Sequence, residues 1–208
     1  MSKEYAQLEK VAASIKQHEI ILAKSGIGKV NAALGAQQLI DEHHPDLIIS
    51  SGCAGGNGDD VNVQDVVVSN ALVYHDVYCG KAIDDTTAYG QVQGMPARYI
   101  PAKELVEKAV ALDCSVKVHA GLIATGDWFV DSKEKMQQIV SLFPEAKAVD
   151  MESCAIAQTC HINKVPFISF RVISDIPLRD TDASQYHDFW NTLADHSFEV
   201  TRKFLLSF

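Results

Sequence analysis

Residues 166–175 read PFISFRVISD, and this stretch decides the fold of the chain. The apolar run from Pro166 to Ile173 is typical of a parallel strand that is buried on both faces. Ser174 and Asp175 follow this run directly. Because α/β sheets collect ligands at the carboxyl ends of their strands, both residues are candidates for a functional site.

Strands and helices alternate along the rest of the chain. Buried strands are predicted over residues 20–23, 46–50, 65–71, 118–125, 146–149 and 166–173. Helices are predicted over residues 29–43, 102–112, 132–142, 152–162 and 184–206, with Ser132 as an N-cap. Glycine-rich turns are expected over residues 25–28 and 52–56, and an irregular functional or interface loop over residues 78–96. This alternation predicts one α/β domain over residues 1–208, with a mostly parallel sheet covered by helices on both faces.

Composition narrows the class of protein. A chain of 208 residues that is 47% hydrophobic can bury one sizeable core. Its formal net charge of −9 opposes binding to nucleic acid or to an anionic membrane surface. We expect a cytoplasmic protein, because residues 1–5 lack an apolar signal region and no apolar run approaches the ~18 residues of a membrane span. The five cysteines are odd in number and lack CxxC spacing, which argues against disulfides and a zinc site.

Four segments place suggestive residues at the ends of predicted strands. They are residues 25–28, 52–56, 149–152 and 173–175. Each segment alone also has a purely structural interpretation. The glycines suit tight turns, Asp150 and Glu152 suit the start of a helix, and Ser174 and Asp175 suit the start of a turn. Neither glycine-rich segment matches the phosphate-binding pattern GxxxxGK[ST], and the absence of HExxH argues against a metal site.

Taken jointly, the motifs resemble the purine nucleoside phosphorylase and nucleosidase superfamily, and most closely its 5′-methylthioadenosine/S-adenosylhomocysteine nucleosidase branch. The resemblance rests on residues 24–30, 52–56, 74–76, 121–123, 126–127, 151–152 and 171–175, which follow one another in the family's order. It implies a three-layer α/β sandwich around a mixed, mostly parallel sheet. It also implies an enzyme that removes adenine from a 5′-thio-substituted adenosine by hydrolysis, without a cofactor or a metal.

The resemblance assigns the catalytic roles to three residues. Adenine leaves poorly as an anion, so its N7 must be protonated, and Asp175 matches the family's general acid. An acid in an apolar pocket has the raised pKa that this work needs. Ser174 would orient Asp175. Glu4 matches the family's general base, which lies in an early Met-x-x-Glu segment and activates a water molecule.

The substrate-binding roles are also implied by the resemblance. Glu152 would accept both ribose hydroxyls, as suits an ionised carboxylate, and Met151 would pack against the sugar. Phe129 and Val130 match positions that stack on adenine and bond its edge. The other assigned residues are Cys53 near the catalytic water, Asp150 and Arg171 in the shared motifs, and Ile27, Tyr89, Pro96 and Tyr186 around the alkylthio group. In the family's homodimer, the loop that holds Tyr89 and Pro96 is lent by the partner subunit.

The chain departs from the family pattern in three places. The strand that precedes the Met-x-x-Glu segment is missing, and the stretch from Glu4 to Ile20 is short. We therefore expect either a start codon assigned too far downstream or a shortened relative that must cover an open sheet edge, for example by oligomerisation. Cys53 stands where this branch usually has serine, and Asp150 stands where glutamate is more usual.

Three rival functions stay open. A phosphorolytic relative would need cations around a phosphate, but residues 49–53 carry no arginine before the glycine. Another purine nucleosidase of the same fold would differ only in its pocket contacts. A catalytically impaired relative would bind the nucleoside without releasing adenine.

Overall fold

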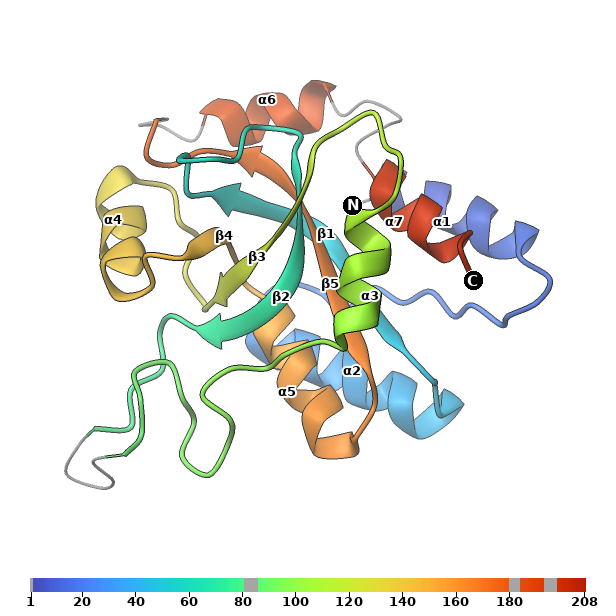
Figure 1. Cartoon of the computed structure of the whole chain (residues 1–208), viewed down its shortest axis with the longest axis horizontal. Coiled ribbons are helices and arrows are strands. Elements are labelled where there is room, and N and C mark those ends of the chain that lie inside the picture. Colours follow the sequence, from blue (N-terminus) through green and yellow to red (C-terminus); the bar gives the residue numbers. More distant parts are fainter. Residues whose placement is uncertain (1, 81–85, 180–183, 193–197) are drawn as a thin grey trace.

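The computed structural model describes residues 2–80, 86–179, 184–192 and 198–208. Its strands are β1 (Ile48–Gly56), β2 (Val66–Tyr74), β3 (Val118–Thr125), β4 (Ala146–Asp150) and β5 (Phe167–Asp175). They form one sheet in the order β1-β4-β3-β2-β5, which closes on itself as a barrel (Figure 1). The β1–β5, β2–β3 and β3–β4 pairs are parallel, and the β1–β4 and β2–β5 pairs are short antiparallel ladders. The expected α/β class with a mixed, mostly parallel sheet is confirmed.

Helices surround this sheet. They are α1 (Ser2–Ser14), α2 (Lys29–His43), α3 (Lys103–Val110), α4 (Lys133–Leu142), α5 (Ser153–Asn163), α6 (Ser184–Thr192) and α7 (Glu199–Leu205). Helices α2 and α5 pack together on one side of the sheet, and α6 lies on the opposite side in Figure 1. Helix α1 packs against α7 near the C-terminus. No helix among the described residues is long and apolar enough to cross a membrane.

Strand β5 carries the stretch that was expected to decide the fold. Every residue from Phe167 to Asp175 is buried. β5 pairs in parallel with β1 along most of its length, and it also meets β2. Ile168, Phe170 and Val172 pack into one apolar cluster, while Ile173 joins another. The strand therefore separates two parts of the core and ends at the candidate acid.

Two local predictions were wrong. Residues 20–23 form no strand, because they do not join the backbone ladder of any described strand. Residues 52–56 continue β1 instead of turning. Missing side chains explain the second result, since a Cβ at Gly52 would lie 2.9 Å from Arg171 Nη1 and one at Gly56 would lie 2.7 Å from Ile176 Cδ1. These glycines let the strand pass close to its neighbours.

The described strands leave no open sheet edge, because the sheet closes through the β1–β4 and β2–β5 ladders. The predicted helix over residues 184–206 corresponds to α6 and α7, and residues 193–197 between them lie outside the described part of the chain.

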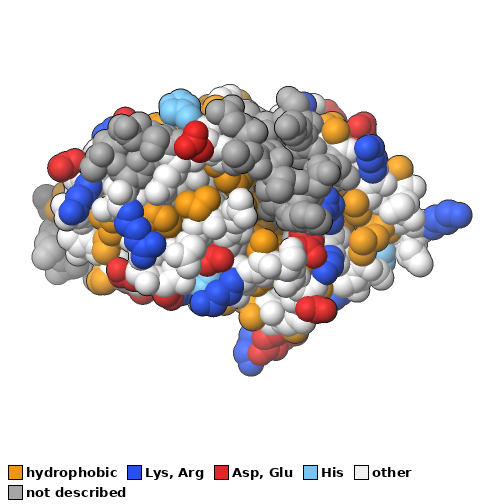
Figure 2. Space-filling view, turned by 90° about the horizontal axis from the view of Figure 1, so that it is seen from above, with side chains coloured by type: hydrophobic (Ala, Val, Ile, Leu, Met, Phe, Trp, Pro, Cys, Tyr) orange, Lys and Arg blue, Asp and Glu red, His pale blue; other side chains and the backbone are white. Residues whose placement is uncertain are grey.

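On the face nearest α6, acidic and basic side chains are interspersed, and hydrophobic side chains gather between them (Figure 2).

Candidate active site

A cavity of about 340 Å³ opens where β1, β4 and β5 end. The walls include most of the residues expected at the site: Ile27, Cys53, Phe129, Val130, Asp150, Met151, Glu152, Arg171, Ser174, Asp175 and Tyr186. They come from segments far apart in the sequence. β1 and β5 are parallel, so their carboxyl ends meet at the same edge of the sheet, and the antiparallel β1–β4 ladder brings the end of β4 beside them.

Asp175 is the last residue of β5 and is buried. The hydroxyl oxygen of Ser174 lies 2.6 Å from Asp175 Oδ1 and 3.2 Å from the carbonyl oxygen of Ala54. By donating to Oδ1, Ser174 fixes the plane of the carboxyl group. Ser174 is therefore placed so that it can orient the Asp175 carboxyl.

Glu152 precedes α5 and faces the start of α2. The backbone N–H of Gly28 donates to Glu152 Oε1 over 3.1 Å, and Arg171 Nη2 lies 3.9 Å from Glu152 Oε2. Burial raises the pKa of the Glu152 carboxyl, and the charge of Asp150 raises it further, against the opposing effect of Arg171. Glu152 is therefore held in a fixed orientation and titrates at a higher pH than an ordinary glutamate.

Arg171 and Asp150 form a buried ion pair beneath the cavity. Arg171 Nε lies 2.6 Å from Asp150 Oδ2, and Arg171 Nη2 donates to the hydroxyl of Ser50 over 3.0 Å. The other Asp150 oxygen accepts from Thr125 Oγ1 over 2.5 Å, and the hydroxyl of Ser153 also donates to Asp150. A buried pair needs such additional hydrogen bonds to offset desolvation. Asp150 therefore acts on the site mainly by holding Arg171.

Aromatic side chains form another part of the cavity wall. The rings of Phe129 and Tyr186 meet edge to face, with centroids 5.1 Å apart at 72°. Trp128 also lines the cavity, and its ring lies 5.2 Å from that of the buried His75. Flat apolar walls of this kind suit a purine ring.

Sequence reasoning missed several residues of the cavity. Trp128 was not assigned to the site from the sequence, although its place beside Phe129 could have indicated the shared wall. Tyr5 and Leu8 of α1 also line the cavity. Their sequence carries no signal that this helix packs against the cavity, since apolar residues on a helix face can pack against any part of the core.

Comparison with known proteins identifies the family of the chain. The phosphorylase superfamily model matches residues 4–206. The 5′-methylthioadenosine/S-adenosylhomocysteine nucleosidase of Chromohalobacter salexigens is 43% identical over 184 residues, which cover 86% of this chain and 76% of the relative. The chain belongs to the 5′-methylthioadenosine/S-adenosylhomocysteine nucleosidase family of the phosphorylase superfamily.

Solved structures of this nucleosidase family have the same fold. The Neisseria meningitidis nucleosidase in complex with methylthio-immucillin-A matches with a TM-score of 0.88 and 34% identity, over 100% of this chain and 96% of that chain. The Colwellia psychrerythraea nucleosidase in complex with adenine matches with a TM-score of 0.85 and 32% identity, over 99% and 91% of the two chains.

Two of the residues expected in the nucleosidase site do not line this cavity. Tyr89 stacks on Tyr78, with centroids 5.6 Å apart at 25°, and its ring lies 6.1 Å from that of Phe143. Pro96 lies in the same irregular segment, partly buried and away from the cavity. Glu4 belongs to α1, but its side chain lies outside the described part of the structure.

Proposed function

We propose that this chain hydrolyses the N-glycosidic bond of 5′-methylthioadenosine and/or S-adenosylhomocysteine, releasing adenine and the thioribose product. The observation that carries the proposal is a single cavity that joins the oriented carboxyl of Asp175, the carboxylate of Glu152 and an aromatic wall. The relatives named above are nucleosidases for these substrates, and one of the solved relatives holds adenine.

Each step of the reaction has a group to perform it. Asp175 protonates adenine N7, so that the base leaves as a neutral molecule. Glu152 accepts the ribose hydroxyls and favours the positive charge that develops on the sugar. Glu4 takes a proton from the attacking water. Phe129 stacks on the base, and the backbone of Val130 bonds its edge.

Hydrolysis suits the charges around the cavity better than phosphorolysis. Among the described residues that line it, the cations are Lys24 and Arg171. Arg171 is already engaged by Asp150 and Ser50, and Lys24 lies 4.4 Å above the ring of Tyr5. A phosphate co-substrate needs cations directed at it. The buried arginine is instead committed to the protein.

An adenine-release assay with methylthioadenosine, run with and without phosphate, tests this function. We expect adenine to appear at the same rate in both reactions, together with methylthioribose. A requirement for phosphate would identify a phosphorylase. Calorimetric binding of methylthioadenosine without adenine release would identify an inert nucleoside-binding protein.

The same proposal includes a homodimer in which the loop around Tyr89 and Pro96 lies near the partner's cavity. It is supported by an exposed apolar stripe on and just before α2, where Ile27 is 59% exposed, Val30 69% and Leu34 65%. Val30 and Leu34 lie one turn apart on α2, and Ile27, which lies just before the helix, also lines the cavity. A stripe of this kind marks an interaction surface, and it runs up to the site that the partner's loop would complete. The cytoplasmic location expected from the sequence stays a prediction.

Leu34→Glu is expected to shift the dimer to a monomer, because the new charge would have to be buried at the interface. Light scattering after size-exclusion chromatography measures the change. Leu206→Glu is the matched control, since Leu206 is 58% exposed at the end of α7 and away from this stripe. A wild-type monomer, or a Leu34→Glu variant that stays dimeric, would refute this interface.

Nucleoside affinity is expected to fall as the pH is lowered through the raised pKa of Glu152, because a protonated carboxyl no longer accepts from both ribose hydroxyls. Calorimetry with a non-hydrolysable nucleoside analogue measures this profile. Glu152→Gln should bind the analogue weakly and lose the part of the profile that belongs to Glu152. Free adenine is the control ligand, since it has no ribose and its profile should be the same in both proteins. An unchanged nucleoside profile in the variant would remove Glu152 from ribose binding.

A further inference from the structure

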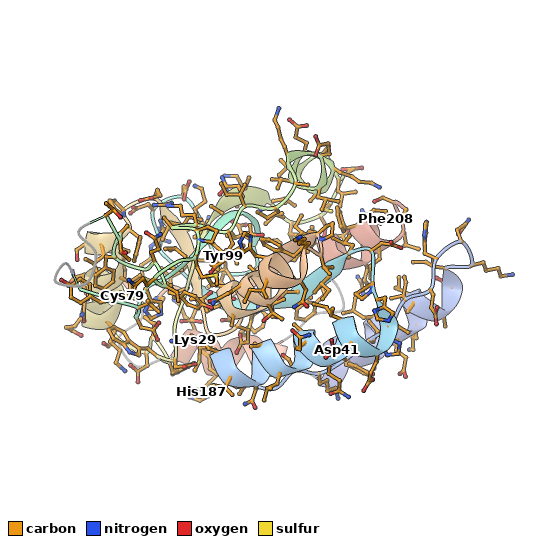
Figure 3. The ribbon with its side chains drawn as sticks, turned by 90° about the horizontal axis from the view of Figure 1, so that it is seen from below. Lys29, Asp41, Cys79, Tyr99, His187 and Phe208 are labelled. Atoms are coloured by element: carbon orange, nitrogen blue, oxygen red, sulfur yellow. The ribbon has the colours of Figure 1, made fainter. Side chains whose placement is uncertain are left out.

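Three charged residues that have no assigned role in the reaction meet beside the cavity. They are Lys29 at the start of α2, Asp76 after β2, and Asp127 after β3. Figure 3 shows Lys29 at one end of α2 and Asp41 near the other. Lys29 Nζ lies 2.8 Å from Asp76 Oδ2 and 3.7 Å from Asp127 Oδ2. The three side chains form one cluster, which we call the Lys29 cluster.

Backbone groups strengthen this cluster. The N–H of Lys29 donates to Asp127 Oδ1 over 2.8 Å, and the N–H of Asp127 donates to Asp76 Oδ2 over 2.9 Å. Asp127 therefore holds α2 through a backbone bond, while its own backbone is held by Asp76. A carboxylate is favoured at this position because the first N–H groups of a helix carry partial positive charge.

The residues next to the Lys29 cluster connect it to two parts of the cavity wall, one at Glu152 and one at Trp128 and Phe129. Gly28 precedes Lys29, and its N–H orients Glu152, the residue proposed to bind ribose. Trp128 and Phe129 follow Asp127 in the aromatic wall proposed to bind adenine. A shift of Asp127 relative to α2 would therefore change the spacing between the adenine wall and the ribose carboxylate.

The backbone at Gly28 is adapted to this junction. Gly28 has φ of 90°, a conformation that favours glycine, and a Cβ there would lie 3.1 Å from Asp127 Oδ1. The absence of a side chain lets the Asp127 carboxylate reach the helix start. One short turn thus presents the Gly28 N–H to Glu152 and the Lys29 N–H to Asp127.

We propose that Asp127 is a positioning residue that sets the spacing between the adenine wall and Glu152, so that it favours binding of a whole nucleoside over binding of free adenine. This inference rests on the proposed function for the identity of the two walls. Asp127 does not line the cavity itself and acts through its neighbours.

Asp127→Ala is expected to lower kcat/KM for methylthioadenosine by about tenfold to a hundredfold, as misplacement of binding groups does. Affinity for a nucleoside analogue should fall in parallel, whereas affinity for free adenine should change less than about twofold, since adenine contacts one wall only. Asp127→Asn keeps an oxygen acceptor for the Lys29 N–H and should restore most of the loss. Kinetics and calorimetry with both ligands supply the measurements.

Asp60→Ala is the matched control for loss of a surface carboxylate. Asp60 pairs with Lys147 and is as exposed as Asp127, with side-chain exposures of 49% and 47%. It is not among the residues that line the cavity, so its variant should behave as wild type. If Asp127→Ala does not fold, Lys29→Met provides a second test. It removes the Nζ contacts but keeps the backbone N–H of residue 29. Its loss of kcat/KM should be smaller, and its affinity should again fall more for the nucleoside analogue than for adenine.

Equal losses of nucleoside and adenine affinity in Asp127→Ala, or no loss at all, would overturn the inference. If only Lys29→Met folds, the inference is overturned when that variant does not lose more affinity for the nucleoside analogue than for adenine. A wild-type protein that releases no adenine would refute the proposed function. The ratio of nucleoside affinity to adenine affinity can still be measured in that case, so the two failures are distinguishable.

Discussion

Asp175→Asn is expected to abolish adenine release while leaving nucleoside binding largely intact. Asparagine has the shape of aspartate, so it should still accept from Ser174, but it has no acidic proton to give to adenine N7. Loss of a general acid lowers the rate by about 10²-fold to 10⁴-fold. The expected signature is a fall in kcat, measured by adenine release, with little change in the calorimetric affinity for a nucleoside analogue.

Asp65→Asn is a suitable control for this experiment. Asp65 is a largely buried aspartate that precedes β2 and lies 3.0 Å from His119 Nε2, away from the cavity. Its variant tests whether loss of a buried carboxylate alone lowers the rate. Near-normal turnover by Asp175→Asn would refute the assignment of Asp175 as the general acid. A matching loss in Asp65→Asn would mean that the effect is one of stability.

Local signals explain which elements could be predicted from the sequence. The bounds of α2 were correct, because Gly28 and His44 stop the helix on both sides with positive φ angles. The residues of β3 and β5 are mostly apolar, and both strands are largely buried in the barrel. Where a segment carries its own start and stop signals, its sequence pattern is enough to predict its bounds.

Tertiary contacts decided the elements that could not be predicted. Gly52 and Gly56 suggest a turn when they are read locally, but they continue β1 because Arg171 and Ile176 occupy the space where their side chains would lie. The apolar segment at residues 20–23 has the composition of a strand, yet a strand also needs a neighbour with which to pair. Composition alone cannot show whether that neighbour is present.

Some residues of the candidate site could be predicted from the sequence, and others could not. Asp175, Glu152 and Asp150 could be predicted because parallel topology places strand ends together, and polar residues there stand out in the sequence. Trp128 and Leu8 could not, because apolar residues that line a cavity look like core residues until their neighbours are known. The Lys29 cluster was visible only as three separate motifs, since its members lie far apart along the chain.

Helix α1 is placed so that a general base from it could serve the cavity. The hydroxyl of Tyr5 donates to the carbonyl oxygen of Leu22 over 3.2 Å, and Lys24 lies above the Tyr5 ring. Tyr5 and the buried Leu8 both line the cavity, and Glu4 belongs to the same helix. These contacts attach α1 to the irregular segment over residues 20–25. The part of the helix next to Glu4 is therefore held against the site.

Glu4→Gln is expected to lower hydrolysis by about 10²-fold to 10⁴-fold, because glutamine cannot take a proton from water. Binding of adenine and of a nucleoside analogue should remain, since neither needs the attacking water. Glu9→Gln is the control on the same helix, where Glu9 is exposed. The assay follows adenine release alongside calorimetry for each variant. An active Glu4→Gln protein would show that the base lies elsewhere, and Glu152, whose pKa is raised by burial, would then be the next carboxylate to test in that role.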